Sequence, residues 1–83
     1  MPARRSAATP EQQERWQASR MRVGANIRAQ RVRAGLTQEA LALECGLSRN
    51  QLIEVEHGRR GLLFERLEDL ATALVVQPSD LLK

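Results

Sequence analysis

Cysteine and aromatic residues are scarce in this sequence of 83 residues, which has one Cys, one Trp, one Phe and no Tyr. A single cysteine excludes an intramolecular disulfide, and so few aromatic residues mean that any core must be aliphatic. No apolar run approaches the roughly 18 residues of a membrane span, and no signal-peptide pattern follows Arg4 and Arg5. We therefore expect one cytoplasmic domain that does not bind a membrane.

Patterns that indicate catalysis or metal binding are also missing. The sequence has no paired histidines, no Cys-x-x-Cys, no glycine-rich phosphate loop and no nucleophile elbow. The lone His57 lies at the end of a predicted helix, where it can favour the helix dipole or touch a phosphate. Cys45 lies on an apolar helix face, where packing is the better interpretation. We expect neither an enzyme nor a site for a cofactor or a metal.

Positive charge is concentrated near the N-terminus, although the net charge is only +3. Residues 1–33 carry eight arginines and two glutamates, whereas residues 34–83 carry five basic and eight acidic residues. The basic excess is either a solvated helix face with a loose tail or a surface that attracts a polyanion such as DNA. The charge pattern alone leaves both interpretations open.

The N-terminal third predicts a long helix with an interruption. Leu, Ala, Glu, Arg and Gln dominate the sequence, which favours an all-α fold. Residues 1–8 are expected to be disordered, and Thr9 followed by Pro10 has the pattern of a capped helix start. The helical pattern continues to Arg33, but Gly24 indicates a break or a second start. The expected units are a basic extension with a tail and a helix, residues 1–21, and a domain, residues 22–83.

Two short helices with their own start signals follow. Thr37 caps the first, residues 38–45, and Gly46 is placed to close it in the left-handed conformation. Ser48 caps the second, residues 49–56, in a capping-box pattern. Further along, apolar residues recur at helical spacing and a proline begins a short last helix, without any strand pattern. The apolar stripe of the helix before that proline comprises Phe64, Leu67, Leu70, Ala71 and Leu74.

The helix at residues 49–56 separates apolar from polar side chains. At about 100° per residue, Leu52 and Val55 fall on one side, and Asn50 and Glu54 fall on the opposite side. Arg49 lies on a flank. Arg can donate to guanine, Asn can pair with adenine and Glu can accept from cytosine. A solvated polar face is the plainer interpretation of this helix taken by itself.

The segment resembles the helix-turn-helix family of phage repressors and Xre/Cro-type regulators over about residues 22–82. The residues that carry the resemblance are Ile27-Arg28, Arg31, Gly35-Leu36-Thr37-Gln38-Glu39, Leu41-Ala42, Gly46-Leu47-Ser48, Val55-Glu56, Gly58-Arg59 and Leu67 to Leu74. The resemblance implies five helices, of which the second and third form the DNA-binding motif. It also implies a structural ion pair between Arg31 and Glu56.

The resemblance further implies which residues would contact DNA. Gln38 would contact a phosphate, and Arg59 and Arg60 would lie beside the DNA backbone. The residues that would face the major groove are Ser48, Arg49, Asn50 and Glu54, with Ser48 closer to a phosphate or capping role. Glu54 is a departure from a basic surface, because it repels phosphate unless it meets a cytosine or an arginine.

A second departure lies in the loop after Arg60. The family usually has a polar residue there that caps the fourth helix, but this sequence has Gly61-Leu62-Leu63. The two leucines either form a dimer contact or fold under the core. Trp16, in the extension, is another candidate for a contact with a second subunit.

These features predict a sequence-specific DNA-binding transcriptional regulator that acts as a homodimer on a two-fold operator of double-stranded DNA. The chain ends at Lys83, directly after the fold, which favours a regulator without a fused sensor domain, such as a restriction-modification controller or a small autoregulator. One alternative is an antitoxin whose residues 1–21 wrap a toxin. Another is a protein-interaction adaptor that does not bind DNA.

Overall fold

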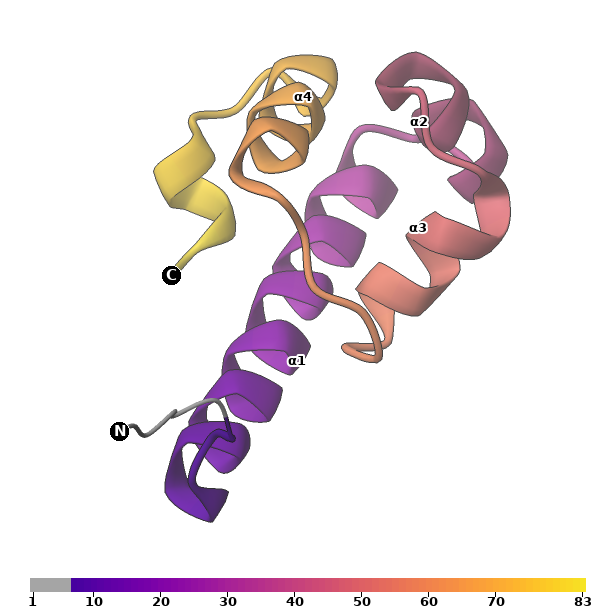
Figure 1. The fold of residues 1–83 in the computed structure, drawn as a ribbon. Helices are drawn as coiled ribbons and strands as arrows, with labels where there is room; N and C mark the ends of the chain where they lie inside the picture. The colour runs from indigo at the N-terminus through magenta and orange to yellow at the C-terminus, as the bar shows by residue number, and fades with distance from the viewer. Residues whose placement is uncertain (1–6) are drawn as a thin grey trace.

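The computed structural model describes residues 7–83, and it is all-α over that range (Figure 1). Its elements are α1 (Pro10–Arg33), α2 (Gln38–Cys45), α3 (Arg49–Glu56), α4 (Phe64–Leu74) and η1 (Pro78–Leu81). The described residues contain four α-helices, and the element expected as a fifth helix is a single 3-10 turn, η1. The disorder expected for residues 1–8 falls almost wholly outside the described residues.

Helix α1 begins where the sequence predicts but has no break. The Gln12 amide donates to Thr9 Oγ1 at 3.1 Å and the Thr9 amide donates to Gln12 Oε1 at 2.9 Å, which completes a capping box. The helix continues through Gly24, so the predicted interruption is wrong and residues 10–21 are not a separate element. A Cβ atom at Gly24 would lie 2.2 Å from the Val55 carbonyl oxygen. The glycine therefore allows α1 to pack closely against the end of α3.

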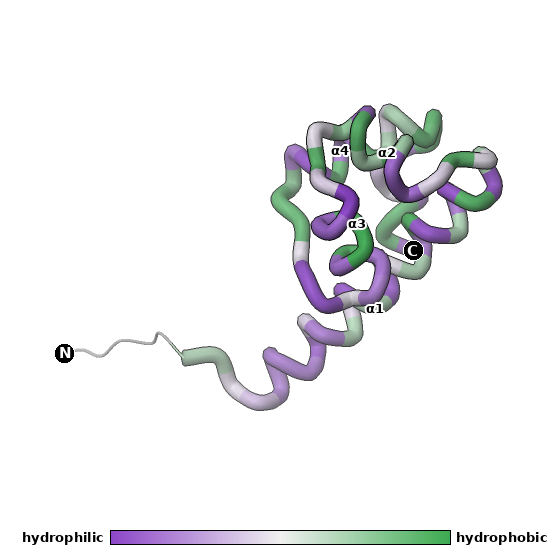
Figure 2. Tube along the Cα trace, turned by 90° about the vertical axis from the view of Figure 1, so that its right-hand side faces the viewer, coloured by the Kyte–Doolittle hydropathy of each residue, from purple (hydrophilic) through white to green (hydrophobic). Residues whose placement is uncertain are grey.

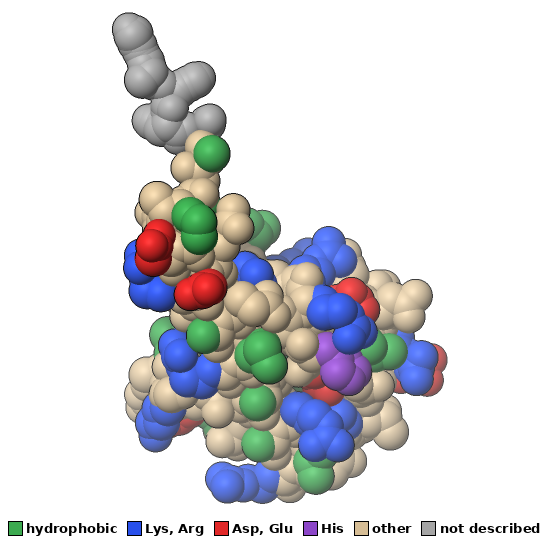
Figure 3. All heavy atoms as spheres, turned by 90° about the horizontal axis from the view of Figure 1, so that it is seen from below, with side chains coloured by type: hydrophobic (Ala, Val, Ile, Leu, Met, Phe, Trp, Pro, Cys, Tyr) green, Lys and Arg blue, Asp and Glu red, His purple; other side chains and the backbone are tan. Residues whose placement is uncertain are grey.

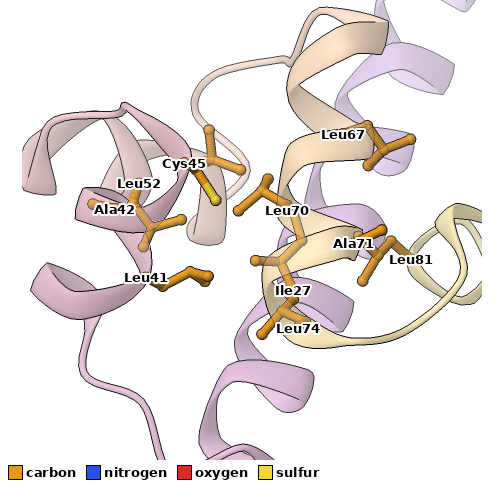
Figure 4. Close-up of a cluster of buried hydrophobic side chains, with 11 residues drawn as sticks. Ile27, Leu41, Ala42, Cys45, Leu52, Leu67, Leu70, Ala71, Leu74 and Leu81 are labelled. Carbon is orange, nitrogen blue, oxygen red and sulfur yellow. The ribbon is translucent and has the colours of Figure 1, made fainter.

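The core is aliphatic and draws on all five elements (Figure 4). Its fully buried side chains are Ile27, Leu41, Leu52, Leu70 and Leu81. The predicted inward face of α2 is confirmed, since Leu41, Ala42 and Cys45 are all buried. Phe64 is a correction to the predicted stripe of α4, because its side chain is 69% exposed.

The first turns of α1 project beyond this core. We call residues 10–20 the arm; Figures 1 and 2 show it as a mostly hydrophilic helix that extends away from the other elements. It accounts for the elongated shape of 51 × 22 × 20 Å. Trp16 on the arm and Met21 just after it are both half-exposed, and Met21 lies beside Gly58. Within residues 7–83, no helix is long and apolar enough to cross a membrane.

Val75 ends α4 in a strained conformation that glycine would relieve. Its φ of 58° is left-handed, and its side chain is 88% exposed. A β-branched residue is disfavoured there, so Val75→Gly should raise the free energy of unfolding by about 1 kcal/mol. Urea unfolding measures the change, with Val75→Ala as the control that removes the branch and keeps an L side chain. Equal effects of the two substitutions would contradict the strain.

Candidate nucleic-acid interface

Helices α2 and α3 are set by the capping residues that the sequence indicates. Thr37 Oγ1 accepts from the Ala40 amide at 3.0 Å, and Gly46 closes α2 with a φ of 70°. Ser48 Oγ accepts from the Gln51 amide at 3.0 Å, and Gln51 Oε1 accepts from the Ser48 amide at 2.9 Å. These bonds satisfy amides that a helix leaves free at its start. The Ser48 hydroxyl is therefore a capping group in this structure.

A buried ion pair joins α1 to α3. Arg31 Nε donates to Glu56 Oε2 at 2.7 Å and Arg31 Nη2 donates to Glu56 Oε1 at 3.1 Å. Arg31 Nη1 also donates to the Leu36 carbonyl oxygen at 2.9 Å, so the guanidinium holds the turn before α2. The structural pair implied by the family resemblance is confirmed, and its two residues are 9% and 6% exposed.

Gln38 extends this network to the start of α2. Its Nε2 donates to Glu56 Oε1 at 3.0 Å, and its side chain is half-buried. An amide nitrogen carries two hydrogens, so one remains for a phosphate. The predicted phosphate contact of Gln38 stays a prediction, but the structure adds that Glu56 orients the side chain.

The exposed face of α3 carries two polar side chains free of protein partners. Arg49 and Asn50 are exposed, and neither side chain has a hydrogen bond to another residue of the range 7–83. Leu52 and Val55, on the other side of the helix, are buried in the core. The predicted division of α3 into an inner and an outer face is confirmed, and its outer face offers donors that a base edge can accept.

Glu54 meets an arginine that the helical spacing does not indicate. Arg59 Nη2 lies 2.8 Å from Glu54 Oε2, and Arg59 Nε donates to both carboxylate oxygens at 3.1 Å. The hydrogen bond from Arg59 lowers the pKa of Glu54 below its usual value. The negative charge of Glu54 is therefore balanced by Arg59, and the carboxylate orients the Arg59 guanidinium. Arg60 is exposed and has no ion-pair partner among residues 7–83.

A polar hollow lies between the start of α2, the end of α1 and α3. Its cationic lining includes Arg28 and Arg49, and His57 and the capped start of α2 also border it. Figure 3 shows Lys and Arg side chains on both sides of the histidine on the face seen from below, with acidic and hydrophobic side chains elsewhere on that face. Arg28 is missing from the predicted site residues. Its position one turn before Arg31 is the sequence signal that could have placed it beside the motif.

Two capped helices around a left-handed glycine, with the outer face of the second open to solvent, define a helix-turn-helix domain. The helix-turn-helix family model matches residues 27–81. The chain belongs to this family, and the resemblance to Xre-type regulators is confirmed.

The relatives are regulatory proteins. The chain is 38% identical over 64 residues to the control protein C.BamHI of Bacillus amyloliquefaciens, covering 76% of this chain and 79% of that protein. The crystal structure of the restriction-modification controller protein C.AhdI from Aeromonas hydrophila matches with a TM-score of 0.75 and 38% identity, over 77% of this chain and 97% of that one. The clp gene regulator ClgR from Corynebacterium glutamicum matches with a TM-score of 0.74 and 33% identity, over 76% and 81% of the two chains. These similarities support a DNA-binding regulator.

Proposed function

We propose that this protein is a sequence-specific transcriptional regulator that binds double-stranded DNA as a homodimer on a two-fold operator. The outer face of α3 carries the proposal, because Arg49 and Asn50 are exposed, without a side-chain hydrogen bond to residues 7–83, on a helix that the core holds in place. One such helix contacts only a few base pairs. Two copies spanning half-sites about 34 Å apart supply the remaining specificity.

Control of a restriction-modification system is the specific role that we favour. C.AhdI, at 38% identity, is named as a restriction-modification controller protein, and C.BamHI, also at 38% identity, is named as a control protein. ClgR, at 33% identity, is a gene regulator of another sort, so the helix-turn-helix fold by itself does not select the role. The restriction-modification role therefore rests on analogy with these relatives, and the DNA sequence of the operator, rather than the fold, tests it.

The proposed contacts divide into reading and anchoring residues. Ser48, Arg49 and Asn50 begin α3 and face the major groove, where Arg49 and Asn50 can donate to base edges. Gln38, Arg59 and Arg60 flank that helix and contact the DNA backbone. Glu54 acts within this surface through its ion pair with Arg59, and its carboxylate can also accept from a cytosine amino group.

Substitution of Arg49 should relax sequence preference. Arg49→Ala is expected to cost about 1–3 kcal/mol of binding free energy and to reduce discrimination at one base pair. Fluorescence anisotropy with a panel of single-base operator variants measures both effects. An equal loss of affinity for every operator variant would show that Arg49 contacts the DNA backbone and not a base.

The Glu54–Arg59 pair should act as a unit. Arg59→Ala is expected to weaken binding to every sequence and to reduce the salt slope by about one contact. It also leaves the Glu54 carboxylate unpaired beside DNA, so adding Glu54→Gln should recover part of the lost affinity. A double-mutant cycle measured by anisotropy isolates this coupling. Strictly additive effects would contradict it.

Selection of bound sequences from a random duplex pool tests the proposed function most directly. A two-fold symmetric motif with half-sites one helical turn apart supports it. Binding without a steep salt dependence would instead favour the adaptor alternative. Co-purification with the product of a neighbouring gene would favour an antitoxin, whose arm wraps that partner.

A further inference from the structure

An apolar groove of about 320 Å³ lies between the arm and the start of α4. Its apolar lining includes Trp16, Val23, Leu62, Leu63, Phe64 and Leu82. Four of these side chains are at least half-exposed: Trp16 at 50%, Leu82 at 51%, Phe64 at 69% and Leu63 at 71%. Large apolar side chains gathered at one exposed place indicate an interaction surface rather than chance exposure.

The charges beside this groove differ in sign from one side to the other. Arg20 on the arm and Arg60 on the loop line it, and Arg20 donates a hydrogen bond to the neutral Gln17 but has no ion pair among residues 7–83. Helix α4 carries the exposed Glu65 and Glu68 in its first turns, and Glu68 follows Phe64 by one helical turn, so it shares a face of α4 with that lining residue. Neither glutamate has an ion pair among residues 7–83. A basic side and an acidic side around one apolar centre match a second copy of the same surface turned by a two-fold axis.

The arm itself has little to hold it in the monomer. Among residues 7–83 its side-chain hydrogen bonds are all local, in the Thr9–Gln12 capping box and between Arg20 and Gln17. The arm continues directly from the packed part of α1, but its own turns lie beyond the core, and packing of an apolar face supplies most of the stability of a helix in a protein. The comparison with C.AhdI covers 97% of that chain but only 77% of this one, and the family model begins at residue 27. Most of the unmatched length of this chain therefore lies before residue 27, in the region that includes the arm.

We propose that the groove is the homodimer interface and that the arm of each copy packs along the start of α4 of the other. Trp16 then enters the apolar centre beside the partner's Phe64, and Arg20 lies across from Glu68 of the partner subunit. The contact is isologous, so both pairings occur twice. This interface rests on the proposed homodimeric regulator. It assigns the contact between the two copies to an arm that lies before the residues matched by the family model.

Charge reversal tests the pairing. Arg20→Glu and Glu68→Arg should each weaken dimerisation by about tenfold or more, because each homodimer then places like charges together twice. An equimolar mixture of the two variants restores both opposite-charge pairs in the heterodimer, so association should recover. Sedimentation velocity over a concentration series, without DNA, compares the wild-type protein, the two variants and their mixture. Arg22→Glu reverses a charge on the far side of the same helix and should leave the dimer unchanged.

Truncation of the Trp16 side chain gives a second, independent test. Trp16→Ala should also weaken the dimer by about tenfold or more, while circular dichroism shows that helix content and unfolding of the core are retained. A wild-type protein that stays monomeric at every concentration would overturn the interface. A dimer that neither Trp16→Ala nor the charge reversals weaken would overturn it as well, because the two copies would then meet elsewhere.

These outcomes are distinct from failure of the proposed function. A monomer that binds a duplex with a steep salt slope overturns the interface and leaves DNA binding intact. A stable dimer that responds to the substitutions but binds no selected duplex supports the interface and overturns the regulator.

Discussion

Glu56→Gln should lower the free energy of unfolding by about 3–5 kcal/mol, because it leaves the buried guanidinium of Arg31 without its counter-charge. The substitution keeps the size of the side chain, so the loss reports charge rather than a cavity. Arg31 Nε lies 2.7 Å from the carboxylate, whose side chain is 1% exposed. Urea unfolding followed by circular dichroism measures the change, provided that the m-value stays constant.

A matched control lies in the same helix. Glu54→Gln breaks the Glu54–Arg59 ion pair, but both side chains there are about half-exposed, at 42% and 53%. Water solvates the partners of such a pair, so the free energy of unfolding should change little. Replacing Arg31 and Glu56 together by Met and Leu should restore most of the stability lost in Glu56→Gln. Equal effects of Glu56→Gln and Glu54→Gln would show that the Arg31–Glu56 pair is hydrated.

The buried pair also bears on DNA recognition. Arg31 holds the turn before α2 through the Leu36 carbonyl, and Glu56 orients Gln38 at the start of α2. One carboxylate at the end of α3 thus fixes two elements that flank the proposed reading face. Preorganised groups bind with a smaller entropic cost than groups that must be ordered on binding.

The sequence predicts the motif well because its determinants are local. Capping at Thr37 and Ser48 and the left-handed Gly46 act within a few residues, so their pattern is visible in one dimension. The division of α3 into two faces follows from helical periodicity for the same reason. The Arg31–Glu56 pair is different, since 25 positions separate its residues, and only the family resemblance indicates it.

Features that depend on how the chain turns after a helix, or on what packs against a helix end, are not predicted. Glu54 finds Arg59 because the chain turns back at Gly58, whose φ is 74°, and this brings together residues outside helical spacing. Phe64 fits the apolar period of α4 but occupies its first position, where the arm leaves a groove open beside it. Periodicity shows which residues share a face, but not whether another element covers each end of that face.

At Gly24, helix propensity and the packing in the structure predict opposite effects of the same substitution. Helix propensity alone predicts that Gly24→Ala stabilises the protein by about 1 kcal/mol, since glycine is a poor residue inside a helix. The structure predicts the opposite sign. An added Cβ would lie 2.2 Å from the Val55 carbonyl oxygen and 2.9 Å from that of Glu56, and backbone atoms cannot rotate away as a side chain can.

We therefore expect Gly24→Ala to lower the free energy of unfolding by about 3 kcal/mol or more, beyond the usual cost of an added methyl group in a core. Gly61→Ala is the control, because the nearest atom to its added Cβ is Arg20 Cδ at 3.7 Å, an ordinary contact. Thermal and urea unfolding of both variants measure the difference. An increase in stability for Gly24→Ala would show that α1 does not pack closely on α3. A large loss would show that the backbones of α1 and the end of α3 meet closely at Gly24.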